Sequence, residues 1–187
     1  MRRFLLPALM ISLLLCGCAN GAEGRLKAQR TVFAAAEELS FTTDMTLLTD
    51  SEVFECTLSC ISRGGTLRIE VTAPENLVGI RVRIEDGEAA LEYGEISLGV
   101  GSAGQSGITP VSAVPLLTEA LRGGFLRRCW TERDGARELL AAELYVTDDA
   151  VLTVWFDAET VSPIHAEFAR DGRTVLRCEI RDFTMTE

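Results

Sequence analysis

Histidine is nearly absent from this sequence, which has one histidine, His165, among 187 residues. Metal sites that need two or three imidazoles therefore cannot form within one chain. Basic residues are also few, with 18 Lys and Arg against 28 Asp and Glu, and they form no basic run. The formal net charge of −10 repels nucleic acid and anionic lipid headgroups. These shortages exclude His-paired metal enzymes and predict that the protein binds no nucleic acid.

The common catalytic motifs are missing as well. The sequence has no GxSxG, no P-loop and no CxxC. Residues 99–104 match GxGxxG literally, but a dinucleotide site needs this turn to open a helix between two parallel strands. Here more loop and then Pro110 follow, so we interpret the segment as a flexible loop. His165 alternates with apolar neighbours and is expected on an exposed outer face beside Glu167. The sequence thus predicts no enzyme, no cofactor and no metal.

No apolar run is long enough to span a bilayer, which takes about 20 residues. Residues 4–15 are apolar except for Ser12 and follow Arg2 and Arg3, as in a secretory signal peptide. The segment Leu15-Cys16-Gly17-Cys18 resembles the bacterial lipobox, which implies that Cys18 is acylated and becomes the first mature residue. We therefore expect a removed signal peptide at 1–17, a lipidated tether at 18–24, and attachment to the lipid membrane at its extracytoplasmic face.

Four cysteines remain in the mature chain: Cys56, Cys60, Cys129 and Cys178. Cys56 and Cys60 lie four residues apart on one face of a strand, roughly 13 Å from each other and too far to form a disulfide. A disulfide between distant strands, for example through Cys129, remains an alternative. A zinc site with His165 lacks close ligand pairs. Buried free thiols are the preferred interpretation.

Apolar and polar residues alternate with a period of two through most of the chain after Ser40. Gly64-Gly65 and the Asp-Gly pairs at 86–87, 134–135 and 171–172 separate these runs as hairpin turns. The pattern predicts a mainly β fold with short helices, built on an antiparallel meander of about ten or eleven strands that is too large to stay flat. Strand–helix–strand units are missing, which excludes a parallel α/β sheet.

Two helices interrupt this pattern. One is expected from Arg25 onward. The other lies within 109–122, with Ser112 as its N-cap, Pro115 in its first turn and Gly123-Gly124 after its end. Its apolar face carries Val114, Leu117 and Leu121. We expect this second helix to close one mouth of the curled sheet.

The run 150–156 is apolar on both faces, unlike the other strands. One face must join the common core, and the other, which carries Trp155, needs a cover of its own. The preferred interpretation is that the first helix covers it with Leu26, Val32 and Phe33. The alternative is a surface for a partner or an acyl chain.

Two stretches together carry a family resemblance. Residues 71–79 form a strand that enters a proline turn and then a glycine, and residues 154–163 read Val-Trp-Phe-Asp-Ala-Glu-Thr-Val-Ser-Pro. Their order resembles the LolA/LolB-like lipoprotein-sorting family, in particular lipid-anchored members of clostridia-type bacteria that include a spore-germination lipoprotein. The resemblance covers most of 25–187 and implies one domain there, an incomplete antiparallel β-barrel with helices plugging its concave side.

The resemblance implies two alternative roles. In the sorting factors the cavity holds acyl chains, so the first hypothesis is a lipoprotein that binds a lipid or an acylated protein. The second is a non-enzymatic scaffold that positions an envelope protein, such as a cell-wall or spore-germination factor. The apolar candidates for the cavity or partner surface are Phe41, Met45, Phe54, Leu58, Leu67, Ile69, Ile80, Val82, Leu117, Leu121 and Trp155.

Overall fold

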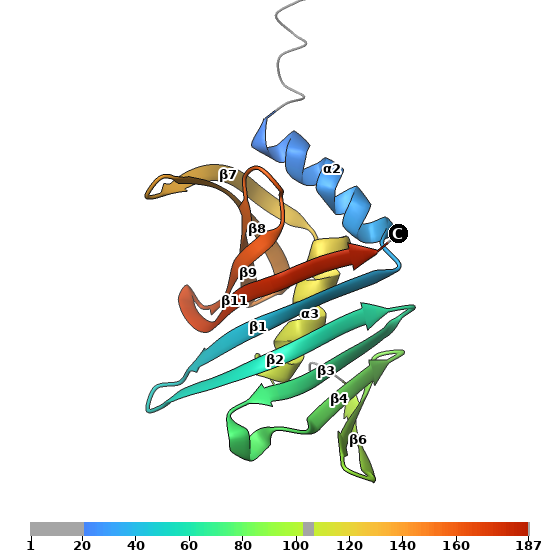
Figure 1. The fold of residues 1–187 in the computed structure, drawn as a ribbon. Helices are drawn as coiled ribbons and strands as arrows, with labels where there is room; N and C mark the ends of the chain where they lie inside the picture. The colour runs from blue at the N-terminus through green and yellow to red at the C-terminus, as the bar shows by residue number, and fades with distance from the viewer. Residues whose placement is uncertain (1–20, 103–106, 187) are drawn as a thin grey trace, which may run out of the picture.

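The computed structural model describes residues 21–102 and 107–186, so the signal peptide, Cys18 and most of the tether lie outside the described residues. Eleven antiparallel strands form one sheet in the order β6-β5-β4-β3-β2-β1-β11-β10-β9-β8-β7 (Figure 1). The strands are β1 (Glu38–Leu48), β2 (Val53–Arg63), β3 (Thr66–Ala73), β4 (Ile80–Glu85), β5 (Glu88–Tyr93), β6 (Ile96–Ser102), β7 (Leu126–Asp134), β8 (Arg137–Thr147), β9 (Ala150–Asp157), β10 (Pro163–Arg170) and β11 (Arg173–Thr186).

Strands β6 and β7 are the two edges of this sheet and do not pair with each other. The curled sheet therefore stays open, which confirms the predicted incomplete barrel and its strand number. The expected hairpins also form. Asp86 and Asp171 have φ of 52° and 51°, and each precedes a glycine that also has positive φ. Two successive residues with positive φ give the turn that matches strand twist in short hairpins.

Residues 99–102, which we interpreted as loop, belong to β6. Gly99 pairs with Ala90 and Gly101 with Ala89 on β5, and a register shift lies between the two pairs. Glycine weakens a strand but does not prevent pairing when the neighbouring strand is regular. The loop interpretation was therefore wrong for these residues, while 103–106 lie outside the described part of the chain.

Helix α2 (Ala22–Ala35) begins at Ala22, inside the segment expected to be tether, rather than at Arg25. Leu26 and Phe33 are fully buried and point into the common core. The helix packs on α3 and β7 at the open side of the sheet (Figure 1). It does not cover the second face of Trp155, so that interpretation was wrong: the most apolar residues of α2 are used in the core.

Helix α3 (Pro110–Arg122) connects the two sheet edges and crosses the concave face, where it contacts β1, β2, β3 and β8 (Figure 1). Its N-cap is Thr109 and not Ser112. The Thr109 hydroxyl accepts from the Ser112 amide at 3.2 Å, and the Ser112 hydroxyl accepts from the Thr109 amide at 2.8 Å. This reciprocal pair is a capping box. Pro110 occupies the first turn, where a missing N–H costs nothing. The placement of Pro115 in the first turn was wrong, because the helix begins earlier, at Pro110, and Pro115 lies inside it.

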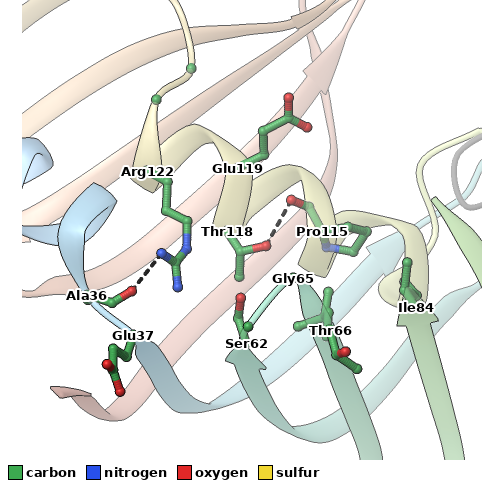
Figure 2. A pocket seen from close by; sticks show the side chains of 14 residues that line it. Ala36, Glu37, Ser62, Gly65, Thr66, Ile84, Pro115, Thr118, Glu119 and Arg122 are labelled. Carbon is green, nitrogen blue, oxygen red and sulfur yellow. Dashed lines mark hydrogen bonds between the residues drawn. The ribbon is translucent and has the colours of Figure 1, made fainter. Parts of the chain in front are cut away.

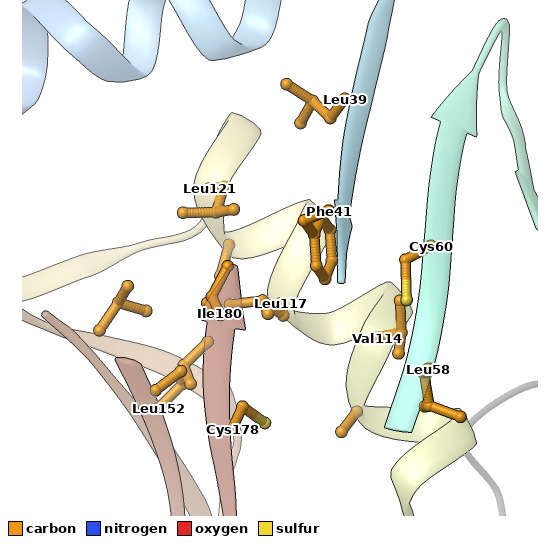
Figure 3. Packing of buried hydrophobic residues seen from close by; sticks show 14 of the residues in the cluster. Leu39, Phe41, Leu58, Cys60, Val114, Leu117, Leu121, Leu152, Cys178 and Ile180 are labelled. Atoms are coloured by element: carbon orange, nitrogen blue, oxygen red, sulfur yellow. The ribbon is translucent and has the colours of Figure 1, made fainter. Parts of the chain in front are cut away.

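The apolar face of α3 fills the centre of the molecule, as its sequence pattern predicted. Val114, Leu117 and Leu121 are at most 2% exposed. They pack against inward side chains of the central strands, among them Phe41 and Cys60 (Figure 3). A 3-10 turn, η2 (Glu75–Leu77), follows β3. None of the helices in the described residues is long and apolar enough to cross a membrane.

Candidate functional site: a groove beside helix α3

Most of the predicted cavity residues are already covered by the protein's own side chains. Eight of the eleven candidates are at most 6% exposed, namely Phe41, Met45, Leu58, Leu67, Ile69, Val82, Leu117 and Leu121. They belong to one continuous hydrophobic cluster. The volume that a half-barrel could offer to a ligand is thus occupied here by α3.

The other three candidates lie elsewhere. Phe54 is 40% exposed near the start of β2, and Ile80 is half-buried at the start of β4. Trp155 is half-buried on the outer face of the sheet, where its ring lies 5.0 Å from that of His165. Ile80 packs against the edge of the core cluster, whereas Phe54 and Trp155 are not part of that cluster.

Free space remains at one side of α3. A groove of about 740 Å³ lies between α3 and the ends of strands β2 to β4 (Figure 2). Its volume is within the usual range for small-molecule sites, about 300–1,000 Å³. The lining residues are Ala36, Glu37, Ser62, Gly64, Gly65, Thr66, Leu67, Ile84, Pro115, Thr118, Glu119, Arg122, Gly123 and Gly124.

The floor of this groove is apolar because of how α3 presents its residues. Leu67 and Ile84 contribute buried aliphatic side chains, and the Pro115 ring faces them from the helix. The Thr118 hydroxyl donates to the Pro115 carbonyl at 2.9 Å (Figure 2) and to the Val114 carbonyl at 3.0 Å, so its polar group is satisfied within the helix. The wall can therefore contact a hydrocarbon chain without leaving a hydroxyl unpaired.

Two glycine pairs keep the groove open. At Gly64 and Gly65 the φ values are 57° and 81°, and an added Cβ would meet only open space. At the end of α3, a Cβ on Gly124 would lie 2.8 Å from the Ala120 Cα, so a larger residue would displace the helix end. The groove therefore has no side chain at the turn between β2 and β3 and none directly after the end of α3.

Arg122 joins the two helices at the rim of the groove. One of its guanidinium nitrogens, Nη1, donates to the Ala36 carbonyl at 2.9 Å (Figure 2). The same nitrogen donates to the Phe33 carbonyl at 3.3 Å. These carbonyls belong to the C-terminal end of α2, which a positive charge stabilises. The exposed carboxylates of Glu37 and Glu119 lie along the same rim. The rim is thus polar and the floor apolar, as expected of a site that buries a chain and leaves its end in water.

The outer face carries a separate cluster around the two tryptophans. Glu132 accepts indole hydrogens from both, from Trp130 at 2.9 Å and from Trp155. His165 lies on this outer face, as predicted, but it is half-buried rather than exposed. Its Nδ1 is 2.8 Å from Glu179 and its Nε2 is 3.5 Å from Glu167. In the part of the chain described, no group of three or more His, Cys, Asp or Glu side chains is arranged so that it could hold a metal ion.

Cys56, Cys60 and Cys178 are buried free thiols and Cys129 is a half-buried one. Burial raises the pKa of the Cys56 thiol to about 11, with a smaller contribution from the Asp44 carboxylate. Burial likewise raises the pKa of Cys178 to about 12, and that of Cys60 well above its usual range. Thiols with such pKa values are protonated near neutral pH and make poor nucleophiles or metal ligands.

The sequence matches no protein-family model and no curated protein. Solved structures do match. A domain from Vibrio parahaemolyticus named for outer membrane lipoprotein sorting has a TM-score of 0.53 and 12% identity, covering 88% of this chain and 93% of its own. The chain has the fold of lipoprotein-sorting domains. This confirms the fold implied by the resemblance to the LolA/LolB-like family.

Two further structures have similar scores. An uncharacterized conserved protein from Thermus thermophilus has a TM-score of 0.52 and 10% identity, covering 89% of each chain. A DUF1329 family protein from Desulfovibrio piger has 0.50 and 10%, covering 86% of this chain and 90% of its own. At these identities the likeness establishes the architecture alone, and the function must be argued from the groove.

Sequence reasoning found only one residue of the groove, Leu67. It missed Ser62 and Thr66 because their polarity placed them outside an apolar list, and Arg122 because nothing in the sequence indicates its contact with α2. A usable signal was present in the glycine pairs Gly64-Gly65 and Gly123-Gly124. We interpreted the first pair only as a hairpin turn and the second only as the end of a helix, whereas both pairs also line the groove.

Proposed function

We propose that this protein is a lipid-anchored lipoprotein of the bacterial cell envelope that binds a hydrophobic chain, from a lipid or an acylated protein, in the groove beside α3. The observation that carries the proposal is the apolar floor formed by Leu67, Ile84 and Pro115 beneath a polar rim. A flexible hydrocarbon chain suits such a site because it gains free energy in proportion to the apolar area removed from water. The groove contains no arrangement for catalysis, and the role is binding.

The proposed anchor is Cys18, three residues before Gly21. The first helix begins at Ala22, so an acylated Cys18 holds the folded domain within a few residues of the membrane surface. Removal of residues 1–17 also removes Arg2 and Arg3 and takes the formal net charge from −10 to −12. An acidic domain is repelled by anionic headgroups, so attachment depends on the lipid.

The test fills the groove. Ser62 is half-buried on its wall and lies opposite Leu67 on the groove face of the sheet, so Ser62→Phe occupies the volume with a residue that favours strands. The control is Thr184→Phe, which adds the same ring at an exposed position of β11. Binding of fluorescently labelled palmitate should weaken at least roughly tenfold in Ser62→Phe and stay unchanged in Thr184→Phe. Equal binding by both variants, at equal melting temperature, would overturn the groove as the site.

A second candidate is the scaffold that positions an envelope protein. The packed interior favours it, because eight of the predicted cavity residues contact other side chains of this protein and leave little interior volume for a ligand. If wild-type protein binds no palmitate and carries no acyl chain by native mass spectrometry, the scaffold becomes the preferred function.

A further inference from the structure

The edge strand β6 carries an unusual amount of exposed apolar surface. Ile96, Leu98 and Val100 are 70%, 60% and 53% exposed, and Tyr93, opposite Ile96 on β5, is 57% exposed. Single exposed apolar residues are ordinary, but a contiguous group on one element marks a binding surface. We call these four residues the β6 patch.

Most of the β6 patch continues the inner face of the sheet. Leu98 lies opposite Leu91, which lies opposite Val82 on β4, which lies opposite buried Ile69 on β3. Directly opposed residues in antiparallel strands point to the same face. Leu98, and by the same rule Ile96, therefore belong to the core face. Helix α3 covers this face over β1 to β3 and leaves it bare at the sheet edge.

The two edge strands differ in whether they are protected against pairing with a further strand. Strand β7 carries Arg127 and Arg128 across a register shift, and both pair with Glu143, at 2.9 and 2.7 Å. Charged side chains and bulges of this kind prevent a further strand from adding to an edge. Strand β6 has no charged residue and no proline between Ile96 and Ser102. Its regular part, before the register shift near Gly99, is an unprotected edge.

The outer side of β6 indicates what adds there. A hollow of about 390 Å³ lies over Gly99 and Gly101, and its rim includes Glu85 and Asp86. The one guanidinium in this lining, from Arg83, pairs with Glu85 at 2.9 Å and with Glu92 at 3.6 Å. Side chains that point outward from an added strand therefore meet a net negative rim, over glycines that leave room for them.

We infer that β6 is a docking edge for an extended segment of another protein, in which apolar and basic residues alternate. The backbone of the segment pairs with β6, its apolar side chains cover Ile96 and Leu98, and its basic side chains face the acidic rim, as in β-strand addition. A second copy of this chain fits poorly, because it brings the same acidic rim and a net charge of the same sign. The inference does not depend on acyl binding in the α3 groove.

The experiment uses a short acetylated and amidated peptide of alternating lysine and valine, labelled with fluorescein. Fluorescence anisotropy should show saturable binding that weakens with salt, and hydrogen exchange should show new protection of the β6 amides. The matched peptide with glutamate in place of lysine should not bind. Leu98→Lys, which adds an edge charge, should weaken binding at least roughly tenfold. Ile61→Lys, an equivalent exchange at the exposed Ile61 of β2, should leave it unchanged.

Three results would overturn the inference. The first is the lack of saturable peptide binding to wild-type protein. The second is equal binding of the lysine and glutamate peptides to the wild-type protein, or equal binding of the lysine peptide to the wild type and to a Leu98→Lys variant whose melting temperature is that of the wild type. The third is β6 protection that rises with protein concentration without peptide, together with a dimer in sedimentation, which would make a second copy the occupant. The Ser62→Phe variant should bind the peptide normally, which separates this outcome from the acyl-binding test.

Discussion

The turn between β9 and β10 depends on one carboxylate, Asp157. Its Oδ1 accepts from the Thr160 amide at 2.9 Å, the Glu159 amide at 3.0 Å and the Thr160 hydroxyl at 3.1 Å. Its Oδ2 accepts from Arg137 Nε at 3.0 Å. This turn lies within residues 154–163, one of the two stretches on which the family resemblance was based, and it closes the hairpin of β9 and β10.

These contacts favour the ionised carboxylate. The pKa of Asp157 is lowered to about 2, first by the Thr160 amide and then by Arg137. Relative to an ordinary value of about 3.9, the difference corresponds to an upper bound of roughly 2.5 kcal/mol. Because the Asp157 side chain is 18% exposed and Arg137 is 56% exposed, solvent screening reduces the contribution to about 1–1.5 kcal/mol.

The sign of the pH dependence follows from the lowered pKa. A carboxyl whose pKa is lower in the folded state stabilises the fold above its unfolded pKa, and the contribution disappears as the pH falls through the folded pKa. The Asp157 contribution should therefore be complete above about pH 5 and vanish between about pH 4 and pH 2. Maximal destabilisation by Asp157→Asn belongs at neutral pH.

The measurement is urea unfolding of wild type and Asp157→Asn at several pH values. At pH 7 the variant should lose about 1–1.5 kcal/mol of unfolding free energy, or roughly 2–6 °C in melting temperature. Glu159→Gln is the control in the same turn, because only the backbone amide of Glu159 takes part in the bonds to Asp157. A difference of the same size at pH 7 and at pH 2 would refute the reasoning, since it would not come from the charge.

Three further predictions concern the anchor, the thiols and the outer face. Cys18→Ala should move the protein from the membrane to the soluble fraction, and continued fractionation with membranes would contradict the lipobox. All four mature cysteines should have free-thiol masses under non-reducing conditions, with Cys60 and Cys178 reacting with thiol reagents only after unfolding and Cys129 first, because burial keeps thiols neutral. Trp155→Ala should lower stability by about 1–2 kcal/mol and leave palmitate binding unchanged, because this ring packs on the outer face; a loss of 3–5 kcal/mol would indicate a core position.

The alternation of apolar and polar residues predicted the strands well, because successive side chains of a strand point alternately to the core and to water. It failed in β6, because Gly99 and Gly101 have no side chain and so give no apolar–polar pattern. Their strand conformation comes from pairing with β5, which the pattern does not show. The prediction for helix α2 failed for another reason. Its periodicity identified Leu26 and Phe33 as inward-facing, but periodicity within one element does not say which face of a distant sheet that element covers.

The candidate site was harder to predict for a similar reason. The residue pattern indicates that Phe41, Leu58 and Ile69 face inward, and they do. Whether inward residues line an empty cavity or contact a helix depends on volumes that involve the whole fold. Here Leu117 and Leu121 come from a segment that is far from β1 to β3 in sequence and fill that space.

The length of α3 explains both the groove and the β6 patch. Eleven strands about 4.8 Å apart span roughly 50 Å around the curve of the sheet. A helix of 13 residues is only about 20 Å long, so α3 covers part of the inner face, and α2 lies toward β7. The inner face is still buried at Val82, Ile84 and Ala89 and becomes exposed only at the sheet edge, at Tyr93 and along β6. If these exposed positions carried polar side chains, water could solvate them and no partner would be needed. They carry the apolar side chains of Tyr93, Ile96 and Leu98 instead, which implies that another molecule covers them.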